Sequence, residues 1–125
     1  MSAKSKKQFG IWIDGHHATI VGRNQISTGE FVVLAHEKNA GKGANSNENA
    51  ANNSERTLQH KFFKEISSHM ENVDELHVTG TGQAQEQLIK FLEETPQYKN
   101  ARATQSTTNK MSDDKLLEFI SSKFN

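Results

Sequence analysis

The stretch "FGIWID", residues Phe9 to Asp14, is the strongest structural signal in this chain of 125 residues. It is almost entirely apolar, rich in residues that favour strands, and followed by Gly15. A strand with one solvated face alternates polar and apolar residues, whereas an unbroken apolar run predicts a strand buried on both faces. We therefore expect residues 9–14 to form a central strand of a sheet.

Two more strands are expected directly after this one. "GHHATIVGR" follows a turn signal at Gly15, and "GEFVVLAHE" follows the polar connection "NQISTG". Strands joined by such short connections form an antiparallel meander.

The polar segment 36–56, "HEKNAGKGANSNENAANNSER", contains no apolar residue larger than alanine. We expect a flexible loop over residues 38–53. Beyond it, apolar residues recur at helical spacing in three segments, with Ser54 and Ser112 as expected N-caps of the first and the third. These segments are "SERTLQHKFFKEISSHM", "QAQEQLIKFLEETPQY" and "SDDKLLEFISSKF", and the strands expected between them are "DELHVTG" and "NARATQS".

The resulting element order is β-β-β-α-β-α-β-α, which predicts an α/β fold with a mixed five-stranded sheet. Right-handed crossovers lay the fourth and fifth strands parallel to the first, so the expected strand order is 3-2-1-4-5, with helices on both faces. This is the ribonuclease H-like arrangement. A single domain over residues 9–125 would follow a basic flexible tail, residues 1–8.

The composition limits the classes of function. Lys and Arg number 15, and so do Asp and Glu, so any contact with nucleic acid must be local. The absence of cysteine excludes disulfides and thiolate metal sites. No apolar run reaches the roughly 18 residues of a membrane span, so we expect a cytoplasmic protein without a membrane partner. No motif indicates a cofactor.

The predicted topology brings four segments to one edge of the sheet, because strands one, three, four and five all end there. These are residues 14–17, the loop after His36, "TGTGQ" at 79–83 and "STTNK" at 106–110. Ligands of open α/β sheets bind outside the carboxyl ends of the strands.

A metal-dependent nuclease is one hypothesis for this edge, because phosphodiester cleavage with two cations needs several converging carboxylates. Asp14 stands at the end of the first strand, but the fourth strand ends in Thr79 and Gly80 without an acid. The favoured alternative is that Asp14 opens a tight turn before Gly15.

A zinc site at the same edge is a second hypothesis, in which imidazole nitrogens of His16, His17 and His36 bind the metal. Adjacent histidines in a strand point to opposite faces, so surface or turn positions are favoured. Asp14, His16 and His36 remain the weak candidates for metal ligands.

The segment "TGTGQ" lies between a strand and a helix, where free backbone amides favour an anion. Gly80, Thr81 and Gly82 could therefore contact an RNA phosphate. A strand-to-helix turn without a ligand is the favoured alternative, since the third glycine of a dinucleotide motif and the lysine of a P-loop are both missing.

Two segments together resemble the central domain of archaeal and eukaryotic peptide-chain release factors and of Pelota-type ribosome-rescue factors. They are "FGIWIDGHHATIVGR" and "SERTLQHKFFKEISSHMENVDELHVTGTGQAQEQLIKFL", and the resemblance extends over roughly residues 9–124. It implies the ribonuclease H-like fold of translational machinery components.

Release factors carry a Gly-Gly-Gln motif in the loop after the third strand, where it promotes hydrolysis of peptidyl-tRNA. This chain has Gly41, Lys42 and Gly43 there and no Gly-Gly-Gln. Pelota-type factors also lack the motif, and bacterial relatives of the family include ribosome hibernation factors. The resemblance thus implies a ribosome- or RNA-associated protein without hydrolase activity.

We accordingly expect a non-catalytic protein that binds ribosomal RNA or tRNA through the carboxyl edge and the loop. The alternative is a protein-interaction module, for instance a homodimer paired through the edge strand "FVVLAH". The residues expected to contact RNA are Lys38, Gly41, Lys42, Gly43, Arg56, Lys61, Gly80, Thr81 and Gly82.

Overall fold

The computed structural model describes residues 7–23, 31–38, 48–70, 73–98 and 101–124, without the side chains of 48–57 and 97. Its elements follow the predicted order, with one short 3₁₀ helix added. They are β1 (Gln8–Ile13), β2 (His17–Arg23), β3 (Phe31–Lys38), α1 (Glu48–Ser67), β4 (Glu75–Gly80), α2 (Gln83–Glu93), η1 (Pro96–Tyr98), β5 (Arg102–Thr107) and α3 (Asp113–Phe124).

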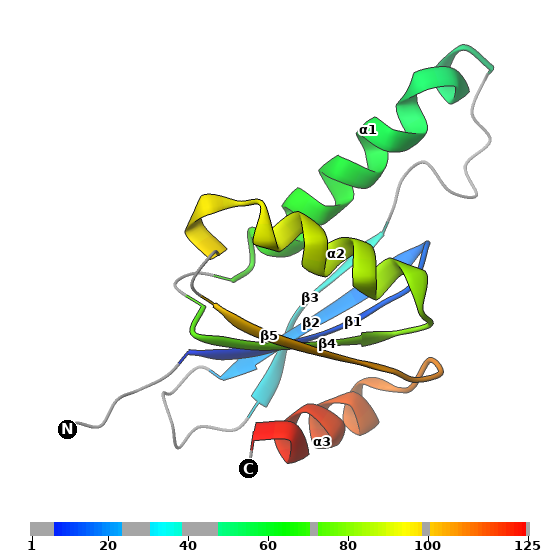
Figure 1. Ribbon diagram of the computed structural model, residues 1–125. Coiled ribbons are helices and arrows are strands. Elements are labelled where there is room, and N and C mark those ends of the chain that lie inside the picture. The colour runs from blue at the N-terminus through cyan, green and yellow to red at the C-terminus, as the bar shows by residue number, and fades with distance from the viewer. Residues whose placement is uncertain (1–6, 24–30, 39–47, 71–72, 99–100, 125) are drawn as a thin grey trace.

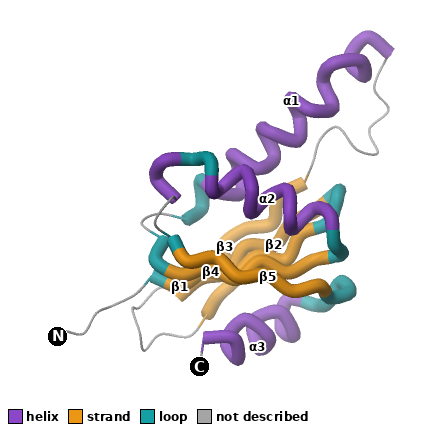
Figure 2. Tube along the Cα trace, in the orientation of Figure 1, coloured by secondary structure: helices purple, strands orange, loops and turns teal. Residues whose placement is uncertain are grey.

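The five strands form one mixed sheet in the order β3-β2-β1-β4-β5. β2 is antiparallel to both of its neighbours, whereas β4 is parallel to β1 and β5 is parallel to β4. α1 and α2 cover one face of the sheet and α3 covers the other (Figures 1 and 2). The predicted ribonuclease H-like α/β fold is confirmed.

β1 is the central strand and is buried on both faces, as predicted. Ile11 and Ile13 belong to the core cluster under α1 and α2, while Trp12 belongs to the cluster under α3. Leu116 and Ile120 of α3 complete that second cluster. Full burial of such a side chain contributes about 1.5–3 kcal/mol, so one short strand anchors both layers.

The prediction for the start of the first helix was wrong. α1 begins at Glu48, so Ser54 lies inside the helix and residues 48–53 are helical rather than loop. The expected start relied on apolar spacing, but alanine and glutamate favour helix without an apolar face, and "ENAA" supplies both. The first part of α1 projects past the sheet (Figure 1). The rest of the expected loop, residues 39–47, lies outside the described residues.

The expected tail, residues 1–8, was also too long. Gln8 opens β1, and the carbonyl of Lys7 accepts hydrogen bonds from the backbone of Asp74 and Glu75. Residues 1–6 lie outside the described part. These contacts join the start of β1 to the start of β4, so the sheet pairing begins at Gln8, one residue earlier than expected.

The other helix ends follow the predicted signals. Ser112 precedes α3, and its Oγ accepts a hydrogen bond from the backbone N–H of Lys115 at 3.3 Å. α2 ends at Glu93, and Pro96 opens the 3₁₀ turn η1.

Among the described helices none is long and apolar enough to cross a membrane.

Candidate functional site at the carboxyl edge of the sheet

The carboxyl edge of the sheet is the place where β1, β3, β4 and β5 end, because only β2 runs in the opposite direction. Across this edge, Lys38 is paired with His17, and Gly80 is paired with both Ile13 and Thr107. The four predicted segments therefore do meet, as far as their residues are described.

Asp14 forms a tight turn at this edge. Its Oδ1 accepts hydrogen bonds from the backbone N–H groups of His16 at 2.8 Å and His17 at 2.7 Å. The backbone N–H of Asp14 donates to the carbonyl of His17 at 2.9 Å, which closes the turn. The favoured turn role of Asp14 is thus confirmed.

The proposed metal ligands are not brought together. Nε2 of His36 lies 3.0 Å from Oδ2 of Asp113, the first residue of α3, rather than beside the histidines of the β1–β2 turn. Within the described ranges, no group of three or more His, Cys, Asp or Glu side chains could hold a metal ion. Neither the zinc hypothesis nor the nuclease hypothesis gains support.

The segment "TGTGQ" is a tightly packed turn between β4 and α2. A Cβ on Gly80 would lie 2.0 Å from the carbonyl oxygen of Ile13, so only glycine fits there. Gly82 has φ = 135°, which also favours glycine. Gly80 is buried, so of the three residues expected to contact an RNA phosphate here only Thr81 and Gly82 reach the surface.

Gln85 holds this turn against β5, and sequence reasoning missed it. Its Oε1 accepts the N–H of Gly82 at 3.0 Å, and its Nε2 donates to the carbonyl of Ser106 at 2.6 Å and to Oγ1 of Thr107 at 3.0 Å. The side chain is only 2% exposed. The signal was available, because glutamine three residues after an N-cap residue is part of the capping-box pattern.

Replacing Gln85 by leucine is expected to lower the free energy of unfolding by about 2–3 kcal/mol. The change leaves the partly buried N–H of Gly82 and the partly buried carbonyl of Ser106 without this partner, and unsatisfied buried groups cost about 1–3 kcal/mol each. Urea denaturation measures the difference. Gln83→Leu, at an exposed position of the same helix, is the control and should stay within about 0.5 kcal/mol of the parent.

The cationic residues expected to contact RNA are only partly described. Lys38, at the end of β3, is exposed at the edge, and Lys110, which precedes α3, is a further exposed cation there. Lys61 is exposed but lies in the last third of α1, away from the helix start. The side chain of Arg56 is not described, and Gly41, Lys42 and Gly43 lie outside the described residues.

Side-chain contacts on both faces of the sheet hold the end of β3 in place. His36 meets Asp113 of α3, and the next residue, Glu37, meets His69 just past α1, with 2.6 Å between Oε2 and Nε2. Consecutive residues of a strand point to opposite faces, which allows both contacts. The strand that leads into the loop therefore leaves the sheet in a defined direction.

A chain of polar side chains joins β4 to β5 under α3. The imidazole of His77 contacts Oγ1 of Thr104 at 2.7 Å and Oγ of Ser106 at 2.9 Å. Ser106 then donates to Oγ1 of Thr79 at 2.9 Å. Burial, and secondarily the charge of Lys123, lowers the pKa of His77 to about 4, so the imidazole is neutral at pH 7.

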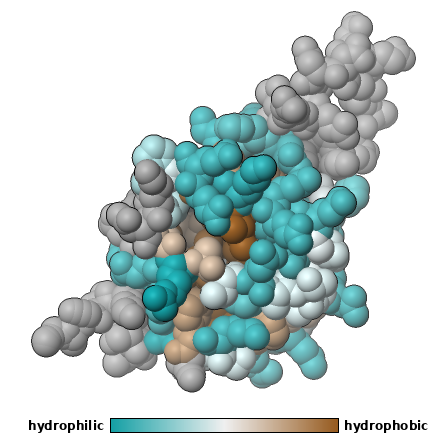
Figure 3. All heavy atoms as spheres, viewed as in Figure 1, coloured by the Kyte–Doolittle hydropathy of each residue, from teal (hydrophilic) through white to brown (hydrophobic). Residues whose placement is uncertain are grey.

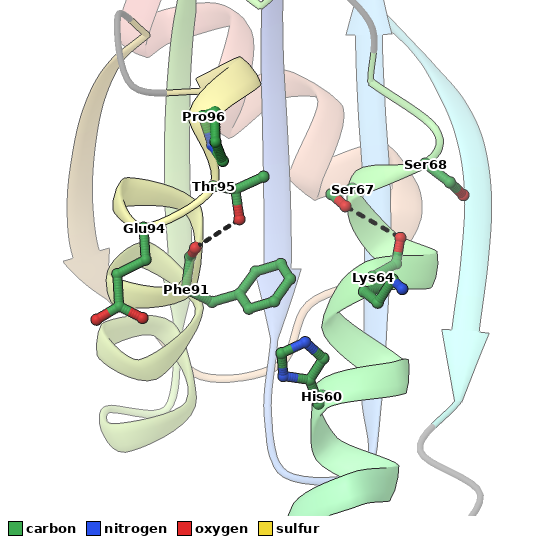
Figure 4. A pocket seen from close by; sticks show the side chains of 8 residues that line it. All are labelled: His60, Lys64, Ser67, Ser68, Phe91, Glu94, Thr95 and Pro96. Carbon is green, nitrogen blue, oxygen red and sulfur yellow. Dashed lines mark hydrogen bonds between the residues drawn. The ribbon is translucent and has the colours of Figure 1, made fainter.

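A groove of about 550 Å³ lies between the C-terminal halves of α1 and α2, on the side of the sheet away from the carboxyl edge (Figure 4). The rings of His60 and Phe91 meet edge to face with centroids 5.0 Å apart. The hydroxyls of Ser67 and Thr95 donate to carbonyls of their own helices. These two hydroxyls are therefore engaged within their own helices and do not face a ligand alone.

No protein-family model matches the sequence, and no curated protein matches it. Solved structures do match. Pelota from Archaeoglobus fulgidus is similar with a TM-score of 0.61 and 16% identity, over 96% of this chain and 32% of that one. The chain has the fold of one part of Pelota.

Two further structures support the Pelota-like fold. Pelota from Thermoplasma acidophilum has a TM-score of 0.56 at 13% identity, over 94% of this chain and 32% of that one. The archaeal translation termination factor aRF1 has a TM-score of 0.57 at 15% identity, over 94% and 34%. This chain spans about a third of the length of these proteins. The resemblance inferred from the sequence is thus confirmed at the level of the fold.

Proposed function

We propose that this Pelota-like domain binds the ribosome as a translation-related protein and contacts ribosomal RNA or tRNA through the carboxyl edge of its sheet. The observation that carries the proposal is the fold shared with Pelota and with the translation termination factor aRF1. The site of action would be the cytoplasm, where ribosomes are. The chain has no Gly-Gly-Gln, so the proposed role is rescue or hibernation rather than peptidyl-tRNA hydrolysis.

The described part of the carboxyl edge supports contact with a phosphate backbone. Lys38 and Lys110 are exposed there, and Thr81 and Gly82 offer a polar turn between them. Lysine side chains neutralise phosphates without reading sequence, as recognition of an RNA backbone requires. Because the whole chain has no net charge, we expect weak binding with a modest dependence on salt.

Co-sedimentation with purified ribosomes at low and high salt tests the proposal. The double variant Lys38→Gln and Lys110→Gln is expected to bind about tenfold more weakly at low salt, because two phosphate contacts are lost. The matched control is Lys64→Gln with Lys90→Gln, which removes the same charge from the ends of α1 and α2 at the opposite edge.

Two outcomes would contradict the proposal. The parent protein could fail to co-sediment with ribosomes from either growing or stationary cells. Alternatively, both double variants could lose the same amount of binding, which would show a general charge effect and not a site at the carboxyl edge.

A further inference from the structure

The sheet has two edge strands, and they differ in regularity. On β3, Leu34 is left out of the pairing, because Ile20 of β2 pairs with Ala35 and Val21 pairs with Val33. A bulge bends an edge strand and discourages the addition of another strand. β3 is an edge strand, as the homodimer hypothesis requires, but its bulge disfavours pairing with a second copy through "FVVLAH".

β5 is the second edge strand of the sheet, and it has no bulge. Its six residues pair with β4 in unbroken register, from Arg102 with Glu75 to Thr107 with Gly80. The backbone N–H of Arg102 donates to Asp74 on the β4 side. Backbone groups of successive residues point to alternate edges, so the N–H and C=O groups of Ala103, Gln105 and Thr107 point away from the sheet. Six hydrogen-bonding groups are thus presented in a row.

A pocket of about 280 Å³, lined mostly by apolar residues, opens beside the first half of this edge strand. Ala101 and Ala103 are small and leave space beneath α2, and Glu93 is the acidic residue of the lining. Figure 3 shows apolar atoms in a hollow between α2 and β5. The lining residues are Leu76, Ile89, Leu92, Glu93, Tyr98, Ala101 and Ala103.

We propose that β5 accepts an extended peptide segment of a partner protein as a sixth strand, with one aliphatic side chain in the pocket between β5 and α2. The outward groups of β5 supply the main-chain hydrogen bonds, and the pocket supplies specificity, as in other cases of strand addition. A basic residue next to the aliphatic one would complement the charge of Glu93. The pocket lies beside the first half of β5, away from the carboxyl edge, and the proposal does not depend on ribosome binding.

A second copy of the chain fits this edge less well. In a symmetric pair, the β5 strand of the partner copy would offer only alanine, glutamine, serine and threonine between its ends. None of these side chains carries an aliphatic group large enough to fill a pocket of this size. The pocket therefore favours a different segment that carries valine, isoleucine or leucine.

A display library of random nine-residue peptides, screened against the full chain, tests the proposal. The selected peptides are expected to share an aliphatic residue with a basic neighbour and to shift the amide NMR signals of Ala103, Gln105 and Thr107. Ala103→Trp fills the pocket and should weaken binding at least about tenfold. The control Arg102→Trp places the same ring on the opposite face of β5 and should change binding less than about twofold.

N-methylation of successive amides in the best peptide tests the strand geometry without altering the protein. Every second methyl group should abolish binding, because alternate amides of an added strand face β5. Equal losses at all positions would overturn the proposal. So would equal binding to Ala103→Trp and the parent, or a library without any peptide that binds more tightly than about 1 mM.

Discussion

Replacing Gly80 by alanine is expected to lower the free energy of unfolding by about 3 kcal/mol or more. The new Cβ would lie 2.0 Å from the carbonyl oxygen of Ile13 and 3.2 Å from Oε1 of Gln85. The first contact is with backbone, which cannot rotate away as a side chain can, so β1 and β4 must separate. Overpacking in a well-packed core costs about 1–3 kcal/mol, and loss of strand pairing adds to it. Guanidinium denaturation followed by circular dichroism measures the change.

Gly15→Ala is the matched control at the same edge of the sheet. A Cβ at this exposed glycine meets nothing within 4 Å, so the variant should stay within about 1 kcal/mol of the parent. Equal denaturation midpoints for Gly80→Ala and the parent would show that the β1–β4 junction is loose. A large loss of stability would instead mean that Gly80, one of the residues expected to contact RNA, is required by the fold.

The architecture was predictable because its signals are local. The apolar run from Phe9 to Ile13 predicts a strand buried on both faces, and helical spacing in three later segments predicts the covering helices. The handedness of crossovers then leaves one strand order. The position of the carboxyl edge follows from that order, which is why the candidate segments were found to meet.

The details of the edge could not be predicted, because they depend on pairs of residues far apart in the chain. His36 meets Asp113, which lies 77 positions away, and the amide of Gln85 reaches the carbonyl of Ser106, 21 positions away. The apolar periodicity that predicts helices and strands gives no information about which distant side chains will contact each other. The helical start at Glu48 was missed for a different reason, since its signal is backbone propensity and not an apolar pattern.

Lowering the pH from 7 to 4 is expected to reduce the stability of the parent protein by about 2–3 kcal/mol through His77 alone. The pKa of His77 is lowered from 6.5 to about 4, chiefly by burial. In the unfolded chain the imidazole takes up its proton near pH 6.5, so the unfolded state binds more protons between pH 6.5 and 4. The free energy of unfolding therefore falls progressively as the pH drops from 6.5 to 4 and changes little through His77 below pH 4.

The variant His77→Gln removes the titrating group from this position. The other five histidines and the carboxylates are present in both proteins, so their contributions cancel in the difference. Urea denaturation at several pH values should show that the parent loses about 2–3 kcal/mol more than the variant between pH 7 and 4. Equal pH slopes, or a His77 Cε1–H signal that titrates near pH 6.5, would mean that Thr104 and Ser106 accommodate the imidazolium at little cost.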